Sequence, residues 1–302
     1  MIDIGGRRLH LLTEGSGRPV VVLESGIAAS SLNWARLQKL AAGLTTVVSY
    51  DRAGFGWSDA PAHGCTAADG ARDLAALLER AELAGPFVLA GHSFGGLIVR
   101  LFQEQYPERV AGMVLVDPIT RSEWRHPNAQ RRGMLARGVR LSRRGALLAR
   151  AGVVGLTLRA LLGGSRAIPK LIARASAGRG AGVMERLTGE VRKMPAELWP
   201  AIAAHWSEAR CFRAMADALE NLPLSVTQIE EGRPLDAIPL VVLSASTATP
   251  AARREHAADA RLSTRGEHTV VPHAGHWIQL DDPQAVADAI ARVVAMVRAD
   301  RC

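Results

Sequence analysis

The stretch AGHSFGG, residues 90–96, places a single serine between glycines, directly after the apolar run PFVL. Gly91, Ser93 and Gly95 form the pattern Gly-x-Ser-x-Gly, and the residues that follow, GLIVRLFQEQ, are typical of a helix. A strand that turns sharply into a helix leaves no room for side chains beside the turn, which explains the glycines, and it projects the serine hydroxyl outward. We therefore interpret Ser93 as a nucleophile; the alternative is a serine that only shapes the turn.

Alternating apolar runs and helical patterns surround this junction and indicate a parallel sheet. Short β-branched runs that end in turn residues predict six strands, at residues 19–26, 44–51, 86–93, 110–118, 238–246 and 267–275. Thr66 with Asp69 resembles a helix capping box, and Asp282 followed by Pro283 begins a last helix. Strands that alternate with helices imply a mostly parallel α/β sheet with helices on both faces.

The alternation breaks after Pro118. Residues 120–231 give helical, arginine-rich and glycine-punctuated segments with no convincing strand. We predict that residues 1–119 and 232–302 form the α/β core and that residues 120–231 are a helical insertion.

Composition indicates an ordinary globular protein. The chain has 302 residues, 48% of them hydrophobic and 22% charged, which is enough to bury a large core. No apolar stretch reaches the about 18 residues of a membrane span, and the first residues lack the pattern of a signal peptide. We therefore expect a cytoplasmic protein. Cys65, Cys211 and Cys302 have no metal-ligand spacing, so we expect free thiols.

Positive charge is concentrated in one segment of a chain whose net charge is +8. Residues 121–179 contain thirteen arginines and one lysine against a single acid, Glu123. Such a segment attracts anionic membranes, polyanions or acidic substrates; the alternative, which we favour, is a solvated helical surface. No nucleic-acid-binding motif accompanies the charge, so we expect no nucleic-acid partner.

A serine hydroxyl needs a base to take its proton, and histidine suits this task near neutral pH. Among nine histidines, we select His276, because it follows the last predicted strand and the carboxyl ends of parallel strands meet at one edge of the sheet. We expect His273 to lie within or at the end of that strand. His92 adjoins the serine but is expected to point elsewhere.

Five stretches, taken in order, resemble the α/β-hydrolase superfamily. They are LESGIAASSLNW (23–34), YDRAGFGWSD (50–59), GHSFGG (91–96), YPERVAGMVLVDP (106–118) and HAGHWIQLDDP (273–283). The resemblance covers nearly the whole chain and implies the α/β-hydrolase fold, with the insertion as a lid that shapes the substrate pocket. It also implies the chain order nucleophile, acid, base.

The resemblance further implies an oxyanion hole of two backbone N–H groups, those of Ile27 and Phe94. Members of the superfamily usually carry His-Gly in the turn before the first donor, whereas this chain has Ser25-Gly26. A backbone donor survives such a change, and Ser25 becomes a possible pocket residue. Glu24 is a carboxylate at the end of a buried strand; it is either a paired structural acid or a residue that organises the pocket or a water.

The position of the acid departs from the commoner pattern. The stretch LSASTATPAARRE, after the next-to-last strand, has no acid before Glu255, which is expected in a helix. Asp117 ends the strand after the serine turn, and some members draw their acid from that position, so we predict that Asp117 orients His276. The alternative for Asp117 is to cap the turn before the lid. The other acids considered receive structural interpretations: Asp51 in the glycine loop, and Asp281 or Asp282 as a helix cap.

Together these residues predict a serine hydrolase that cleaves an ester or related acyl bond of a small to medium, largely apolar substrate. Ser93, His276 and Asp117 form its triad, and no metal or organic cofactor is needed. One alternative is a lyase or other cofactor-free chemistry in the same site; a less favoured one is a non-catalytic ligand-binding receptor. Dehalogenases and epoxide hydrolases of this fold use an aspartate nucleophile, so Ser93 argues against them.

The lid offers one further alternative. LLARAGVVGLTLRALLGG (147–164) mixes leucines and valines with arginines, as an interfacial helix does. We prefer the interpretation that its apolar face covers the pocket, and leave weak association of the basic lid with an anionic membrane surface as the alternative. The sequence does not determine the substrate or the oligomeric state.

Overall fold

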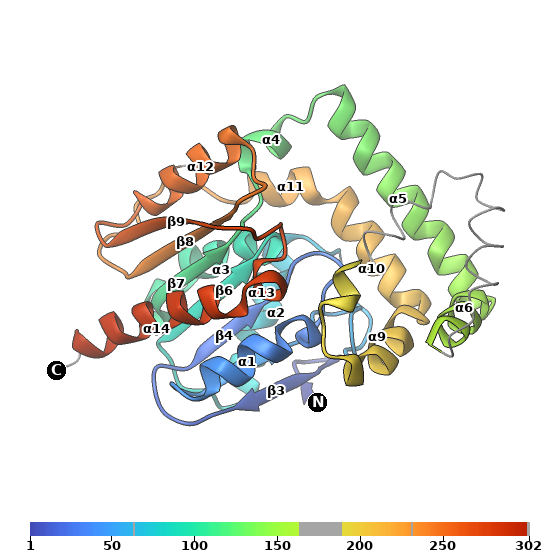
Figure 1. The fold of residues 1–302 in the computed structure, drawn as a ribbon, viewed down its shortest axis with the longest axis horizontal. Coiled ribbons are helices and arrows are strands. Elements are labelled where there is room, and N and C mark those ends of the chain that lie inside the picture. Colours follow the sequence, from blue (N-terminus) through green and yellow to red (C-terminus); the bar gives the residue numbers. More distant parts are fainter. Residues whose placement is uncertain (63, 163–188, 231, 301–302) are drawn as a thin grey trace.

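A computed structural model describes residues 1–62, 64–162, 189–230 and 232–300. Within these residues the centre is a seven-stranded sheet of order β3-β5-β4-β6-β7-β8-β9 (Figure 1). Its strands are β3 (Leu11–Glu14), β4 (Val21–Glu24), β5 (Val47–Tyr50), β6 (Phe87–His92), β7 (Val110–Val116), β8 (Leu240–Ala245) and β9 (Gly266–Val271). β3 pairs antiparallel with β5, and the other pairs of this sheet are parallel. The predicted α/β fold is confirmed.

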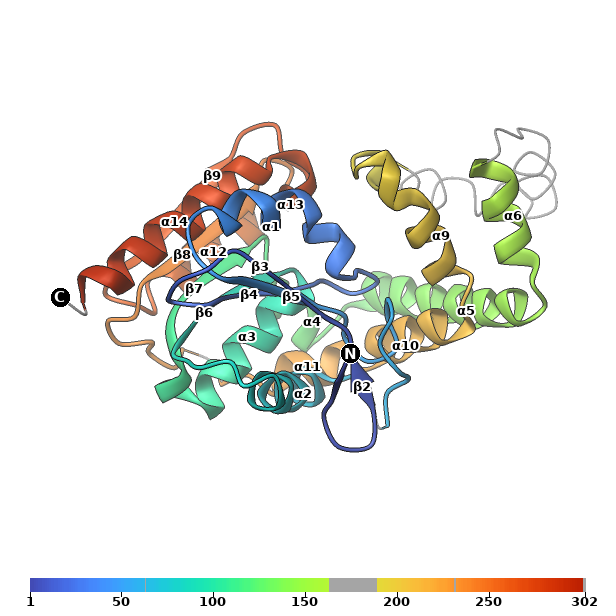
Figure 2. The ribbon, with the colours of Figure 1, turned by 90° about the horizontal axis from the view of Figure 1, so that it is seen from below.

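Both faces of the sheet are buried, which is why its central strands are mostly apolar. Successive residues of a strand point to opposite faces. In β4, Val22 therefore joins the cluster packed by α2 (Ala67–Arg80) and α3 (Phe94–Gln105), whereas Val21 and Leu23 join the opposite cluster. That second cluster is packed by α1 (Ala35–Ala42) and α14 (Pro283–Ala299), and Figure 2 shows the two helix layers on either side of the sheet.

The helix starts follow the local sequence. Thr66 and Asp69 form the predicted capping box of α2. The Asp282 carboxylate accepts a hydrogen bond from the Ala285 N–H at 3.0 Å, and Pro283 opens α14. The apolar residues of α14 are buried on one face: Val286, Ile290, Val293, Val294 and Val297. Glu255 lies in α12 (Pro250–Ala260), as expected.

Three strands near the N-terminus were not predicted. β1 (Ile2–Asp3) and β2 (Arg8–Leu9) form a separate two-residue pairing. β3 lies at the edge of the main sheet, and its Leu12 and Thr13 side chains are exposed. An edge strand of this kind lacks the continuous apolar run that identifies a buried strand.

Helices occupy the described part of the region between β7 and β8. They are α4 (Arg121–Arg125), α5 (Ala129–Arg150), α6 (Val153–Leu162), α9 (Trp199–Trp206), α10 (Ala209–Glu220) and α11 (Leu222–Thr227). α5 packs along α10, and α6 lies beside α9 (Figures 1 and 2). The stretch 147–164 is not one continuous helix: α5 ends at Arg150, Gly152 adopts a φ of 74°, and α6 begins at Val153. Residues 163 and 164 lie outside the described residues.

Ion pairs and apolar packing fasten these helices to the core. The Arg121 guanidinium of α4 pairs with Asp259 of α12 at 2.5 Å. Lys193 pairs with Asp281, also at 2.5 Å, in the short helix α13 (Ile278–Asp281). Leu222 of α11 joins the main hydrophobic cluster. None of the described helices is long and apolar enough to cross a membrane.

Candidate active site

Ser93 occupies the tight turn between β6 and α3. Its backbone has φ 53° and ψ −116°, a conformation that residues other than glycine rarely adopt. A Cβ atom on Gly91 would lie 2.6 Å from the carbonyl oxygen of Gly95, and one on Gly95 would lie 2.3 Å from that of Glu24. Both glycines are therefore required by close packing, which agrees with the reason inferred from the sequence.

The structure brings the three predicted triad residues together from three separate strand ends. His276 follows β9, and its Nε2 lies 2.9 Å from the Ser93 Oγ. Its Nδ1 lies 2.7 Å from the Asp117 Oδ2. The His276 side chain is 48% exposed and that of Asp117 is 10% exposed, so the imidazole links a buried carboxylate to a site that reaches the surface.

Asp117 directly follows β7 and is held by a second hydrogen bond. Its Oδ1 accepts from the backbone N–H of Ala245 at 2.8 Å. Burial disfavours the charged carboxylate, but the hydrogen bond and charge of His276 outweigh it, so the pKa of Asp117 lies below its ordinary value. An ionised Asp117 favours the proton of His276 on Nδ1, which leaves Nε2 free to accept the proton of Ser93.

The two other histidines near the turn have different surroundings. His92 is fully buried, and its Nε2 lies 2.8 Å from the backbone carbonyl of His276, which requires Nε2 to donate. Burial, with a smaller contribution from His276, lowers the pKa of His92 to about 3, so its ring is neutral. His92 thus holds the loop that carries His276. His273 lies beyond the end of β9 rather than within it, in a turn with φ 60°.

The predicted oxyanion-hole residues flank the serine turn. A Cβ atom on Gly26 would lie 3.3 Å from the Cβ of Ser93, so the turn that leads to Ile27 lies against the nucleophile. Phe94 is the first residue of α3, where backbone N–H groups have no acceptor within the helix. The Ser25 hydroxyl contacts the segment that follows β4, where its Oγ accepts from the Trp34 Nε1 at 2.9 Å.

Glu24 and Asp51 lie in the same region but make structural contacts. The Glu24 carboxylate is fully buried, accepts from the Tyr50 hydroxyl and pairs with the Arg52 Nη1 at 2.5 Å. Burial raises the pKa of Glu24 in spite of the Arg52 charge. Asp51 accepts from the backbone N–H of Ser31 at 2.7 Å and from that of Trp57 at 3.0 Å, which orders the glycine loop as expected.

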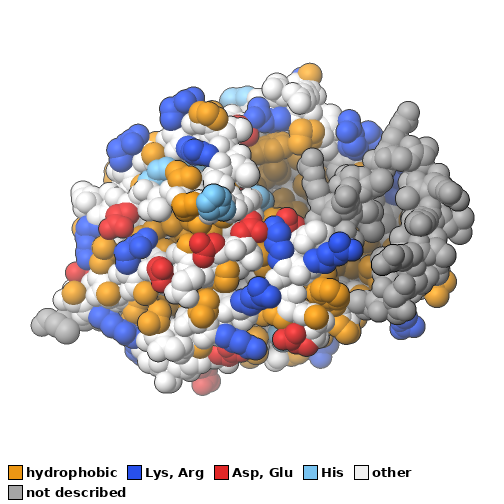
Figure 3. Space-filling model, in the orientation of Figure 1, with side chains coloured by type: hydrophobic (Ala, Val, Ile, Leu, Met, Phe, Trp, Pro, Cys, Tyr) orange, Lys and Arg blue, Asp and Glu red, His pale blue; other side chains and the backbone are white. Residues whose placement is uncertain are grey.

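One face of the molecule is hollowed. Figure 3 shows a recess in the surface whose visible walls are mostly hydrophobic, with histidine side chains at its edge. Among the described residues, no group of three or more His, Cys, Asp or Glu side chains is arranged to hold a metal ion.

Comparison with known proteins places this arrangement in a family. The family model described as "Alpha/beta hydrolase family" matches residues 20–289. The chain belongs to the α/β-hydrolase family. The serine turn and the histidine after the last strand lie in two of the five stretches on which the resemblance in the sequence was based.

Curated relatives of this α/β-hydrolase match part of its length. One is a 2-(acetamidomethylene)succinate hydrolase of Mesorhizobium japonicum, 33% identical over 116 residues, which are 38% of this chain and 41% of the relative. Another is a haloalkane dehalogenase of Sphingobium indicum, 30% identical over 128 residues, which are 41% of this chain and 43% of the relative. The chain thus spans less than half the length of either relative.

Solved structures resemble the whole α/β-hydrolase chain at low sequence identity. A thermophilic esterase from Thermogutta terrifontis has a TM-score of 0.63 and 23% identity, with 96% of this chain and 94% of that chain covered. An epoxide hydrolase has a TM-score of 0.69 and 20% identity, with 98% and 97% covered. These likenesses establish the fold.

Proposed function

We propose that this α/β-hydrolase is a serine hydrolase that cleaves an ester or a related acyl bond through an acyl-enzyme. The observation that carries the proposal is the position of the His276 imidazole, with Nε2 2.9 Å from the Ser93 hydroxyl and Nδ1 2.7 Å from the Asp117 carboxylate. Ser93 is the nucleophile, His276 the general base and acid, and Asp117 the group that orients His276.

In the first step, the Ser93 Oγ attacks the carbonyl carbon of the substrate while His276 Nε2 takes the hydroxyl proton. The carbonyl oxygen becomes negatively charged and accepts from the N–H groups of Ile27 and Phe94. His276 then gives its proton to the leaving oxygen, the bond between that oxygen and the acyl carbon breaks, and the acyl group remains on Ser93.

In the second step, water replaces the leaving group. His276 takes a proton from a water molecule, whose oxygen attacks the acyl carbon, and the same two N–H groups stabilise the second oxyanion. His276 returns the proton to Ser93 Oγ as the acyl–serine bond breaks. The products are a carboxylic acid and the free enzyme.

We further propose a small to medium, largely apolar substrate, which requires that the recess with hydrophobic walls in Figure 3 leads to Ser93. Relatives and structural neighbours include an esterase, an epoxide hydrolase and a haloalkane dehalogenase. Because the last two types use an aspartate nucleophile, the serine at position 93 favours acyl transfer over their reactions.

A panel of p-nitrophenyl esters of increasing acyl length, assayed with wild type and Ser93→Ala, tests the proposal. We expect the wild type to turn over short and medium esters. In the variant kcat should fall at least about 10³-fold, and the residual rate comes from the oxyanion hole and substrate binding alone. Labelling of Ser93 by a fluorophosphonate without turnover of any ester would favour a lyase. Ligand binding and biological activity that both persist in Ser93→Ala would favour a receptor.

A further inference from the structure

The two reaction steps leave one buried ion pair unused, although it lies beside the serine turn. Glu24 ends β4 with a fully buried side chain, and the Arg52 side chain that pairs with it is only 10% exposed. The second carboxylate oxygen of Glu24 accepts from the buried Tyr50 hydroxyl. A buried charge is costly unless it is paired and hydrogen-bonded, so this arrangement holds the guanidinium of Arg52 in one place.

Arg52 makes two further hydrogen bonds to the backbone of the turn that precedes Ile27. Its Nη1 also donates to the carbonyl of Ser25, and its Nη2 donates to the carbonyl of Gly26 at 2.5 Å. The guanidinium carbon lies 5.6 Å from the centre of the Phe94 ring, so Arg52 also packs against the residue that supplies the second oxyanion donor.

The bond to the Gly26 carbonyl bears directly on the donor at Ile27. The carbonyl of Gly26 and the N–H of Ile27 belong to the same peptide group, which is planar and trans. The two bonds therefore point in opposite directions within one plane. Fixing the oxygen therefore fixes the direction of the N–H. A positively charged donor on the oxygen also polarises the peptide, which strengthens the N–H as a donor.

We propose that Arg52 is a positioning residue for the oxyanion hole: anchored by Glu24 and Tyr50, it orients and polarises the peptide whose N–H at Ile27 meets the oxyanion. This role rests on the proposed serine-hydrolase function. Arg52 acts through the backbone and does not itself touch the substrate. The planar fork of arginine reaches the carboxylate and two successive carbonyls at once, which the single ammonium of lysine does not.

Two variants separate this role from a structural one. Arg52→Lys keeps the charge and loses the fork. Glu24→Gln combined with Arg52→Met removes both charges, so no unpaired buried carboxylate is left to unfold the protein. The matched control is Arg7→Met with Asp73→Asn, because Arg7 and Asp73 form another largely buried ion pair, 16% exposed on each side, between the β1–β2 turn and α2.

The readouts are kcat and KM for a p-nitrophenyl ester, and the inhibition constant of a trifluoromethyl ketone, whose serine adduct places an oxyanion in the hole. We expect kcat of both Arg52 variants to fall about 10- to 100-fold, less than the loss of a whole donor, with KM nearly unchanged. The ketone should bind more weakly by a similar factor. The control should lose thermal stability, while its kcat and its inhibition constant for the ketone stay near those of the wild type.

Folded Arg52 variants that keep the wild-type kcat and ketone affinity would overturn the positioning role. A control that loses as much kcat and ketone affinity as the Arg52 variants would also overturn it, because the effect would then come from a general loosening of the core. A wild type that neither turns over esters nor reacts with the ketone would overturn the serine-hydrolase proposal itself, which distinguishes that failure from failure of the Arg52 role alone.

Discussion

Asp117 divides its two carboxylate oxygens between His276 and the backbone N–H of Ala245. An asparagine at position 117 can still accept from Ala245, but it loses the charge that stabilises the imidazolium and fixes the ring tautomer. We expect Asp117→Asn to lower kcat about 10³- to 10⁴-fold with the fold intact. Ester turnover and circular dichroism together measure the two effects.

The matched control for Asp117→Asn is Asp282→Asn, because asparagine caps a helix as well as aspartate does. Both activity and stability should stay near wild type in that control. Near-normal turnover in Asp117→Asn would instead move the search for the acid to Glu24 or Asp51.

His92 couples stability to pH through its burial. Its pKa is about 3 in the folded protein against 6.5 for an ordinary histidine. The unfolded chain therefore binds more protons between these values, and this contribution to stability is complete above pH 6.5 and is lost as the pH falls toward 3. The His92→Gln side chain can still donate to the His276 carbonyl. As the pH is lowered, the free energy of unfolding of this variant should fall less steeply than that of the wild type.

Urea unfolding of wild type and His92→Gln at several values between about pH 4 and 6.5 measures this difference, whose upper limit is about 1.4 kcal/mol per pH unit. Parallel curves for the two proteins would contradict the burial of a neutral His92.

The sequence pointed to Ser93 and His276, which lie 2.9 Å apart in the structure, because each follows a recognisable strand. Arg52 was missed, although it lies in the stretch 50–59. The two carbonyls that it contacts, those of Ser25 and Gly26, are 27 and 26 positions away along the chain. The sequence likewise left open the role of Glu24, because its partners are distant along the chain: Tyr50 ends β5, and Arg52 lies in the loop after it.

At the scale of elements, the junction of β6 and α3 tolerates no added atoms. A Cβ on Gly95 would meet backbone on the neighbouring strand end, at 2.3 Å from the Glu24 oxygen and 2.8 Å from the Ser25 oxygen. Backbone cannot swing away as a flexible side chain can. We expect Gly95→Ala to destabilise the protein by about 1–3 kcal/mol and to reduce turnover sharply, as measured by urea unfolding and ester assays.

Gly133 offers the control for that substitution. It lies in α5, and a Cβ there would meet no atom within 4 Å. Gly133→Ala should therefore stabilise the protein by about 0.5–1 kcal/mol through helix propensity and leave turnover unchanged. Equal effects of the two substitutions would contradict the packing described for the serine turn.

The elements that the sequence predicted well share a physical signature. Parallel strands buried on both faces need long apolar runs, and a capping residue in the sequence marks where a helix begins. β3 lacked such a run because it lies at an edge with exposed side chains. The break between α5 and α6 depends on a positive φ at Gly152 inside a helix-like pattern, which periodicity alone does not reveal.

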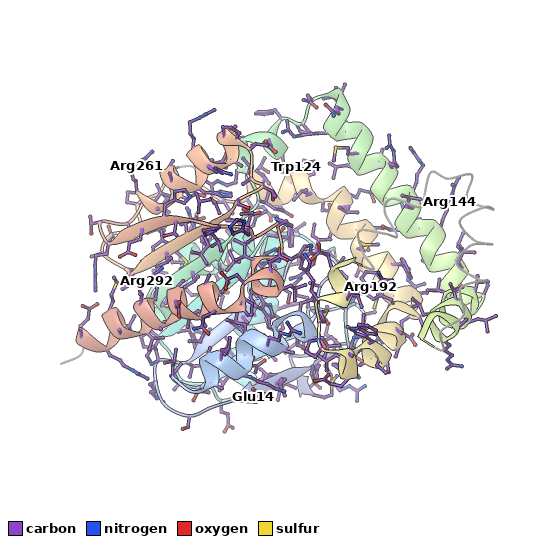
Figure 4. The ribbon with its side chains drawn as sticks, in the orientation of Figure 1. Glu14, Trp124, Arg144, Arg192, Arg261 and Arg292 are labelled. Atoms are coloured by element: carbon purple, nitrogen blue, oxygen red, sulfur yellow. The ribbon has the colours of Figure 1, made fainter. Side chains whose placement is uncertain are left out.

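At the scale of the whole molecule, positive charge gathers on α5. This helix carries seven arginines and no acid. Two of them pair with acids, Arg131 with Glu123 and Arg143 with Glu220. Arg137, Arg140 and Arg144 are exposed, and Figure 4 shows Arg144 on the side of α5 that points away from the sheet. This distribution is consistent with weak attraction to an anionic lipid surface.

Flotation with anionic vesicles tests that attraction. Attraction would appear as binding at low salt that disappears near physiological ionic strength, because screening shortens the reach of exposed charges. The triple variant Arg137→Gln, Arg140→Gln, Arg144→Gln should lose binding. A triple variant of scattered exposed arginines, with Gln at positions 36, 80 and 254, removes the same charge and should keep it. No flotation at low salt would favour a merely solvated surface.

In the proposed mechanism a single hydroxyl, that of Ser93, attacks the substrate after activation by His276. The most direct test of this mechanism is to inactivate the wild type with a fluorophosphonate and to map the modified residue by peptide mass spectrometry. We expect one adduct per chain, on Ser93, formed in step with the loss of ester turnover and much more slowly in His276→Ala. Full turnover without an adduct, or an adduct on another residue that accounts for the loss of activity, would contradict it.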